Sequence, residues 1–192
     1  MPPIIQQKTC AFGAGFFASE CIPEGTVVLR EKPFMLPTTE ASTARTMFRL
    51  IDRVLRADDK TRDAFLRFVP HAVDAHSVPY ESIAREHLEL CPHLTKHEAV
   101  LYATKYVRNA FHTRAGPALL FQGQIFNHSC SPNTRFALEE AKDAKAKEMV
   151  FRTCRPVQKG EQLFDCYGHN PALKKQAAHR KLLSQYGFAC RC

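Results

Sequence analysis

Long apolar runs are missing from this sequence. No stretch approaches the ~18 apolar residues that a membrane-spanning helix requires, and the N-terminal sequence M-P-P-I-I-Q-Q-K-T-C lacks the apolar core of a secretory signal peptide. We therefore expect an intracellular protein, in the nucleus, the cytoplasm or both. In a reducing compartment the eight cysteines are better explained as buried thiols or metal ligands than as disulfides.

Internal repeats and low-complexity linkers are missing as well. A chain of 192 residues suffices for one domain with a hydrophobic core but is short for two full domains. Lys and Arg outnumber Asp and Glu by 27 to 19, which favours acidic partners without identifying one. The basic cluster Leu173–Lys181 is typical of a solvated helix face, so nucleic acid is a weakly supported partner, and we expect a monomer.

Strand and helix patterns alternate along the chain. F-G-A-G-F-F-A and T-V-V-L-R-E predict strands in the first forty residues. From about Ser42 a helical pattern begins, and a second apolar segment runs into the breaker Pro70. The first helix has one apolar stripe, formed by Met47, Leu50, Ile51, Val54 and Leu55. T-K-H-E, beginning at Thr95, has the form of a capping box and predicts a helix that ends near Asn109.

Strand patterns return in N-T-R-F-A-L and M-V-F-R-T-C-R-P-V. Between them lies the charged stretch Glu139–Glu148, which we interpret as a solvated hairpin loop, and a last helix is expected at Ala172–Gln185. The order predicts an α+β fold, mainly β, in four segments: strands in 1–37, a helical insert in 38–108, a second β part in 109–171, and a helix with a C-x-C segment in 172–192.

The stretch F-N-H-S-C-S-P-N at Phe126–Asn133 places an amide, an imidazole, a hydroxyl and a thiol in succession. A thiol nucleophile would use His128 and Cys130, although catalytic pairs usually meet through the fold rather than along the sequence. A zinc site would use Cys130 with the C-x-C at Cys190 and Cys192. A small-molecule cradle would use G-A-G, where glycine allows close backbone approach. No single feature decides among these sites.

Taken in order, G-A-G-F-F-A, N-H-S-C-S-P-N, G-E-Q-L-F-D-C-Y-G and Y-G-F-A-C-R-C resemble the motifs of the SET domain protein lysine methyltransferases. The similarity is greatest to the subclass that usually carries a MYND zinc finger. The helical block corresponds to that family's insert, but 38–108 contains a single cysteine, Cys91, and thus lacks the ligand cluster of a finger. The resemblance implies a SET-type β-fold of short strands with a pseudoknot, a helical insert and a cysteine-containing post-SET segment.

The resemblance also implies S-adenosylmethionine as the cofactor and a protein lysine, on a histone of chromatin or on another protein, as the methyl acceptor. Tyr167 matches the catalytic tyrosine, which orients the amine and the methyl group. An ordinary phenol, with a pKa near ~10, stays protonated at neutral pH, so Tyr167 is not assigned as a simple general base. The positions that match cofactor contacts are Ala14, Gly15, Phe16, Asn109, Asn127, His128, Tyr186 and Phe188.

Finally, the resemblance implies one zinc ion held by Cys130 and by a C-terminal C-x-C-x-x-C segment. The sequence given ends at Cys192, so Cys130, Cys190 and Cys192 provide three thiolates where a closed structural site has four. We expect a weak site in this chain and a further cysteine beyond it. The alternatives to an enzyme are a SET-fold binding module without turnover and a zinc-stabilised interaction domain.

Overall fold

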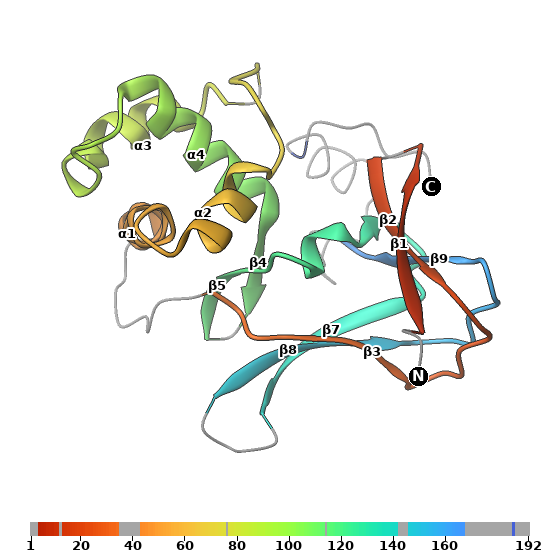
Figure 1. The fold of residues 1–192 in the computed structure, drawn as a ribbon. Helices are drawn as coiled ribbons and strands as arrows, with labels where there is room; N and C mark the ends of the chain where they lie inside the picture. Colours follow the sequence, from red (N-terminus) through yellow and green to blue (C-terminus); the bar gives the residue numbers. More distant parts are fainter. Residues whose placement is uncertain are drawn as a thin grey trace. The chain divides into compact units, whose positions relative to one another are not determined.

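The structure is a computed structural model that describes residues 4–11, 13–34, 43–75, 77–113, 115–141, 146–167 and 186. The chain divides into two compact units. The first comprises residues 1–33, 122–184 and 188–192, and the second comprises 34–121 and 185–187. The first unit contains the β-rich parts of the chain, and the second contains the helices (Figure 1).

The first unit contains a sheet in the order β1-β2-β9-β6. β1 (Ile5–Cys10) and β2 (Gly13–Ala18) form an antiparallel hairpin, and Gly13 at the turn has φ of 95°, a left-handed conformation that glycine adopts without strain. β9 (Gln162–Asp165) pairs antiparallel with β2, and the two-residue β6 (Asn127–His128) pairs parallel with β9. The glycine-hinged strand predicted near the N-terminus is therefore present as β2.

The second sheet of this unit has the order β3-β8-β7. Its strands are β3 (Val27–Glu31), β8 (Lys147–Thr153) and β7 (Thr134–Glu140). The interpretation of the charged stretch as a loop was wrong at both ends, because β7 and β8 extend into it and pair Glu140 with Lys147. Arg152 on β8 and Glu139 on β7 form an ion pair at 2.8 Å. This attraction across the strands compensates the low strand propensity of the charged residues.

Aromatic rings join the two sheets in the core of the first unit. The ring of Phe126 lies 4.5 Å from that of Phe151 on β8 and parallel to it, and 5.0 Å from that of Phe16 on β2. Phe126 follows the 3-10 turn η2 (Gly123–Ile125) and is fully buried. Such contacts between rings add to the burial of apolar area, so this stack fixes the backbone that leads into β6.

The second unit is a helical block with a small hairpin. Its helices are α1 (Thr43–Leu55), α2 (Asp59–Leu66), α3 (Tyr80–His87), the 3-10 turn η1 (Leu88–Leu90) and α4 (Lys96–Asn109). The predicted stripe of α1 is buried except for Leu55, which is partly exposed. The predicted capping box is confirmed: Thr95 Oγ1 accepts from Glu98 N–H at 3.2 Å, and Glu98 Oε2 accepts from Thr95 N–H at 2.8 Å.

The hairpin of β4 (Ala110–Thr113) and β5 (Gly116–Leu119) belongs to the helical unit. Phe34 exchanges two backbone hydrogen bonds with Leu119, of 2.9 and 3.0 Å. These bonds explain why the unit covers 34–121, wider than the 38–108 expected from the helical patterns.

One lysine of the helical unit is buried. The Lys105 ammonium donates to the carbonyls of Leu66 and Phe68 where α2 ends, and burial lowers its pKa to about 8. Carbonyls at a helix C-terminus lack partners within the helix. The Lys105 ammonium is the hydrogen-bond donor to these carbonyls at the end of α2.

The helix expected at Ala172–Gln185 lies outside the described residues. Tyr186, which follows it in the sequence, is described. Among the helices that the structure describes, none has the length and apolar character needed to cross a membrane.

Candidate functional site

A glycine contact joins β2 to β6 in the first unit. Asn127 Nδ2 donates to Ala14 O at 2.8 Å and lies 3.7 Å from Cys10 Sγ. A Cβ built on Gly15 would overlap Gln162 Nε2 and would lie 3.0 Å from Asn127 Nδ2. Glycine is thus needed here for close approach rather than for its backbone angles. With both amide hydrogens directed at Ala14 and Cys10, the Asn127 Oδ1 atom is the one with acceptor capacity toward a ligand.

His128 is held in one tautomer by the backbone of Tyr167. The Tyr167 N–H donates to His128 Nδ1 at 3.0 Å, so a neutral ring carries its hydrogen on Nε2. Nε2 lies 3.3 Å from Cys130 Sγ and therefore donates to the sulfur. A catalytic base would instead have to accept the thiol proton at this nitrogen. A neutral His128 in this tautomer therefore cannot take the proton of the Cys130 thiol at Nε2.

The Tyr167 hydroxyl has a fixed partner. It donates to the Phe126 carbonyl at 2.6 Å, and the Tyr167 ring centroid lies 5.4 Å from that of His128. The segment before Phe126 is anchored by Glu31, whose carboxylate accepts the backbone N–H groups of Gln122 and Gly123 at 3.1 and 2.8 Å. A hydroxyl whose hydrogen is donated keeps acceptor capacity on its oxygen.

A buried carboxyl group lies on the strand that leads to Tyr167. Asp165 is 5% exposed, and burial raises its pKa to about 7, although the Cys166 N–H opposes part of the rise. Its backbone is paired with His128 across the β6–β9 ladder. The site therefore contains an acid that titrates near neutral pH within the same short pairing that carries His128.

β9 bonds to β2 near its start and to β6 at its end, in both cases through backbone groups on the same edge. Along a strand, the backbone groups of successive residues point to alternate edges. The Glu161 carbonyl, just before β9, accepts from Ala18 N–H on β2 at 2.9 Å, and the Asp165 carbonyl accepts from Ser129 N–H, just after β6, at 2.9 Å.

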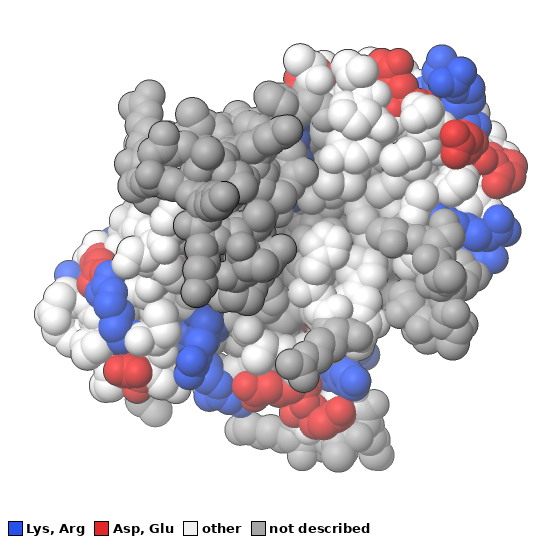
Figure 2. Space-filling view, turned by 180° about the vertical axis from the view of Figure 1, so that it is seen from behind, with Lys and Arg blue, Asp and Glu red and all other residues white. Residues whose placement is uncertain are grey.

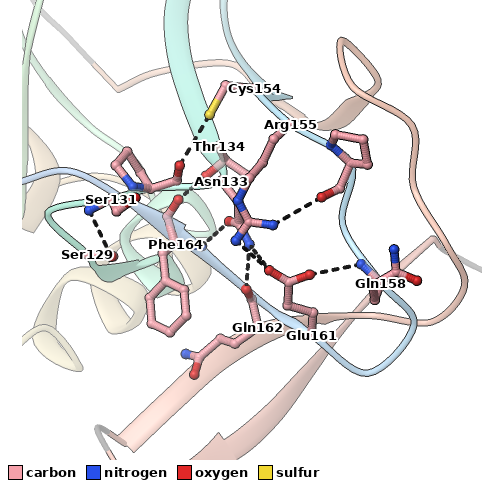
Figure 3. A network of polar contacts seen from close by, with 12 residues as sticks. Ser129, Ser131, Asn133, Thr134, Cys154, Arg155, Gln158, Glu161, Gln162 and Phe164 are labelled. Carbon is pink, nitrogen blue, oxygen red and sulfur yellow. Dashed lines mark hydrogen bonds and ion pairs between the residues drawn. The ribbon is translucent and has the colours of Figure 1, made fainter. Parts of the chain in front are cut away.

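The opposite edge of β9 is bonded by Asn133 and Thr134, which follow β6 along the chain. Asn133 Nδ2 donates to the Gln162 carbonyl at 2.8 Å, and Asn133 Oδ1 accepts from the Phe164 N–H at 2.8 Å (Figure 3). Thr134 Oγ1 donates to the Phe164 carbonyl at 2.6 Å. Loop 129–132 thus crosses from one edge of β9 to the other.

The ion pair between Arg155 and Glu161 holds in place a carboxylate that accepts a hydrogen bond from Asn133. Asn133 Nδ2 also donates to Glu161 Oε1 at 3.1 Å, and Glu161 is bound by Arg155 at 2.6 Å and by the Gln158 N–H at 2.9 Å (Figure 3). Burial alone would raise the pKa of Glu161, but the bonds from Arg155, Gln158 and Asn133 together hold it below its ordinary value. The carboxylate therefore stays charged and remains a strong acceptor for Asn133.

The sequence-predicted site residues fall into three groups. The first unit brings together Ala14, Gly15, Phe16, Asn127, His128, Cys130 and Tyr167. Asn109 belongs to the second unit, where its amide donates to the carbonyls of Val69 at 2.8 Å and Lys105 at 2.7 Å. Tyr186 also belongs to that unit and is partly exposed.

The third group, Phe188, Cys190 and Cys192, lies outside the described residues. Among the residues that are described, no three His, Cys, Asp or Glu side chains gather as a metal site would require. Of the expected zinc ligands the structure therefore shows Cys130, which is exposed and bonded to His128.

Sequence analysis assigns no role to four residues of the site, which are Cys10, Gln162, Asp165 and Asn133. Cys10 and Gln162 lie against the glycine contact, with Gln162 Nε2 donating to Cys10 Sγ at 3.7 Å, and Asp165 is the buried carboxyl group of β9. No local pattern marks Cys10. The second asparagine of N-H-S-C-S-P-N was a usable signal for Asn133, because a polar residue after proline at a strand start has few reasons to be fully buried.

Comparison with protein families gives a match to the SET domain over residues 13–168. Among curated proteins, the SET domain-containing protein L678 of Acanthamoeba polyphaga mimivirus is 30% identical over 192 residues, which cover 94% of this chain and 72% of that protein. The protein-lysine N-methyltransferase SMYD4 of Mus musculus is 26% identical over 118 residues, 61% of this chain but only 13% of the mouse protein.

Solved structures show the same fold. The SET domain of LSMT bound to lysine and AdoHcy superposes with a TM-score of 0.70 at 13% identity, covering 98% of this chain and 53% of that one. Rubisco LSMT bound to AdoMet superposes with a TM-score of 0.67 at 15% identity, covering 99% of this chain and 53% of that one. The chain thus spans about half the length of these structural relatives.

Proposed function

Because the chain belongs to the SET domain family, we propose that it is a protein-lysine N-methyltransferase that uses S-adenosylmethionine. The observation that carries the proposal is the convergence of Asn127, His128 and Tyr167 on the short β6–β9 pairing. The relatives add support, since SMYD4 is a protein-lysine N-methyltransferase and LSMT is bound to lysine and AdoHcy.

The residues around Gly15 fit the cofactor. Gly15 lets the Gln162 and Asn127 side chains pack against β2, and Asn127 Oδ1 is an acceptor for an ammonium or amine group of a ligand. Bound S-adenosylmethionine supplies an electrophilic methyl group on a sulfonium. The chain's own contribution is to hold this ligand through Ala14, Gly15, Phe16, Asn127 and His128, with Asn109, Tyr186 and Phe188 as further proposed contacts.

On the substrate side, Tyr167 orients the acceptor amine. Its hydrogen is held by Phe126 O, so its oxygen accepts an N–H from the incoming lysine and aligns the nitrogen lone pair with the methyl group. A charged ammonium has no lone pair, so the lysine attacks in its neutral form, which an apolar surrounding favours. Catalysis is then positioning and desolvation rather than proton removal by the enzyme.

The acceptor is a lysine of a protein, either a histone or another protein. On the face drawn in Figure 2, the described Lys and Arg side chains lie beside Asp and Glu side chains rather than in a single basic field. The described part of this face therefore presents charges of both signs to a protein substrate.

The test of the function is incubation of the chain with isotopically labelled S-adenosylmethionine, a histone panel and a cell extract, read by mass spectrometry of lysine residues. The proposal expects label on lysine. Binding of S-adenosylhomocysteine in calorimetry without transfer would instead identify a binding module, and zinc content without cofactor binding would identify an interaction domain.

Replacing Asn127 by alanine is expected to weaken cofactor binding by about 1–3 kcal/mol. The change removes Oδ1 as an acceptor and also leaves Ala14 O without its donor. Isothermal calorimetry with S-adenosylhomocysteine measures the effect, with thermal unfolding to show that the variant is folded. Unchanged affinity would make Asn127 a structural residue.

We also propose that Cys130, Cys190 and Cys192 bind one zinc ion, with water or a further residue in the fourth position. Cys130 is an exposed thiol whose sulfur lies 3.3 Å from His128 Nε2, so it is accessible to a metal ion. Cys130→Ser is expected to lower the zinc retained after dialysis by at least ~10-fold. Cys21→Ser is the matched control, because Cys21 is also an exposed thiol. Equal zinc contents in the two variants, by elemental analysis, would refute this assignment.

A further inference from the structure

The pairing that carries the site is too short to fix itself. β6 has two residues, and its ladder with β9 consists of Asn127 opposite Phe164 and His128 opposite Asp165. A shift of one residue in a strand pairing turns every side chain to the other face of the sheet. In such a shift His128 would lose the Tyr167 N–H. The β2–β9 ladder also has only two paired positions, Phe16 opposite Leu163 and Phe17 opposite Gln162, so a further contact that holds β9 is of value.

The Asn133 side chain has the chemistry for that task. Its NH2 group faces the Gln162 carbonyl and its Oδ1 faces the Phe164 N–H, both at 2.8 Å. A residue in a parallel ladder makes the same two bonds, donating to one residue of the neighbouring strand and accepting from the residue two positions later. The carboxamide therefore acts in place of a peptide group of a neighbouring strand opposite Leu163.

No other side chain satisfies these partners equally well. Aspartate lacks the donor, serine and threonine have a single hydroxyl, and glutamine is longer by one methylene. The second NH2 hydrogen is directed to Glu161 Oε1, which Arg155 holds in place (Figure 3). The amide can therefore neither flip nor rotate without losing three bonds, and Asn133 is fully buried.

We propose that Asn133 is a positioning residue for the proposed methyl transfer, and that its carboxamide sets the register of β9 so that Tyr167 meets His128 and Phe126. Tyr167 follows Phe164 by three residues along the chain. Asn133 bonds to Gln162 and Phe164 of β9, just before the residues that lead to Tyr167, on the edge opposite to β6. It acts on Tyr167 through the backbone and does not touch the reacting atoms.

The test substitutes Asn133→Ala and measures both kinetics and amide hydrogen exchange by NMR. We expect kcat to fall at least ~10-fold with a smaller change in cofactor affinity. We also expect the N–H groups of Ser129 and Tyr167, bonded to Asp165 O and His128 Nδ1, to exchange at least ~10-fold faster.

Thr153→Val is the matched control. Thr153 is buried in the same unit, and its Oγ1 bonds to Pro23 O at 2.6 Å and to Thr26 N–H at 3.0 Å rather than to β9, while valine keeps its backbone pairing with Thr134. It should lower thermal stability while leaving kcat and the exchange of Ser129 and Tyr167 near their original values. Equal loss of protection in the two variants at equal loss of stability would overturn the proposal, as would an unchanged kcat in Asn133→Ala.

Should Asn133→Ala fail to fold, Thr134→Val provides the same measurement. It removes only the 2.6 Å bond from Thr134 Oγ1 to the Phe164 carbonyl on the same edge. Selective loss of protection at Ser129 and Tyr167 supports the proposal, and unchanged protection overturns it. The exchange measurement needs no methyl transfer, so it decides the role of Asn133 even if the original chain proves inactive and the proposed function fails.

Discussion

Replacing Tyr167 by phenylalanine is expected to lower methyl transfer at least ~10-fold while leaving cofactor affinity within a factor of a few. The substitution keeps the ring beside His128 but removes the oxygen that the Phe126 carbonyl holds at 2.6 Å. The acceptor amine then loses its hydrogen-bond partner at the moment of attack, whereas the residues around Gly15 are untouched. The loss should therefore appear in kcat rather than in binding.

The measurement combines mass spectrometry of the methylated lysine with calorimetry for S-adenosylhomocysteine. Tyr102→Phe is the control, because Tyr102 lies on α4, where its ring packs against Phe65 in the second unit. Turnover close to the original value in Tyr167→Phe would show that the hydroxyl is not needed. A parallel fall in cofactor affinity would show that Tyr167 acts in binding.

The second large effect is expected in stability, from Asp165→Asn. Burial raises the pKa of Asp165 from its ordinary value of 3.8 to about 7. Between these values the folded chain holds a proton that the unfolded chain has lost, so the free energy of unfolding falls as pH rises through this window. A rise of this size corresponds to a loss on the order of 4 kcal/mol above neutral pH. Asparagine keeps the shape and removes the buried charge.

We therefore expect Asp165→Asn to gain stability relative to the original chain as pH rises, by ~2–3 kcal/mol between about pH 5 and about pH 8.5. Urea unfolding at the two pH values measures this change. Asp59→Asn on α2 removes one exposed carboxylate of the same kind and serves as the control. A stability difference that is the same at both pH values would mean that Asp165 is ionised throughout the range.

The parts of the fold that sequence predicts well are those encoded by near neighbours. The capping box that begins at Thr95 involves residues three positions apart, and the stripe of α1 is a matter of helical period, so both are readable before any tertiary contact is known. For Asn127, His128 and Tyr167 the resemblance to a family predicts site roles, and the structure shows that these residues lie close together.

What sequence could not predict are bonds between distant positions. Asn133 reaches Phe164 over 31 residues, and Glu31 reaches Gln122 over 91. Lys105 looks like a surface residue of an ordinary helix until the end of α2 is placed against it. Asp165 lies on the buried face of β9, where its carboxyl group is enclosed by other elements. In each case the decisive partner lies in another element.

The bond from Tyr167 to the Phe126 carbonyl also limits what Tyr167 can do with the substrate proton. A hydroxyl whose hydrogen is held by a carbonyl can receive a hydrogen bond, but it has no reason to take up a proton at neutral pH. In the proposed methyl transfer, Tyr167 therefore orients the amine of the lysine and does not remove its proton.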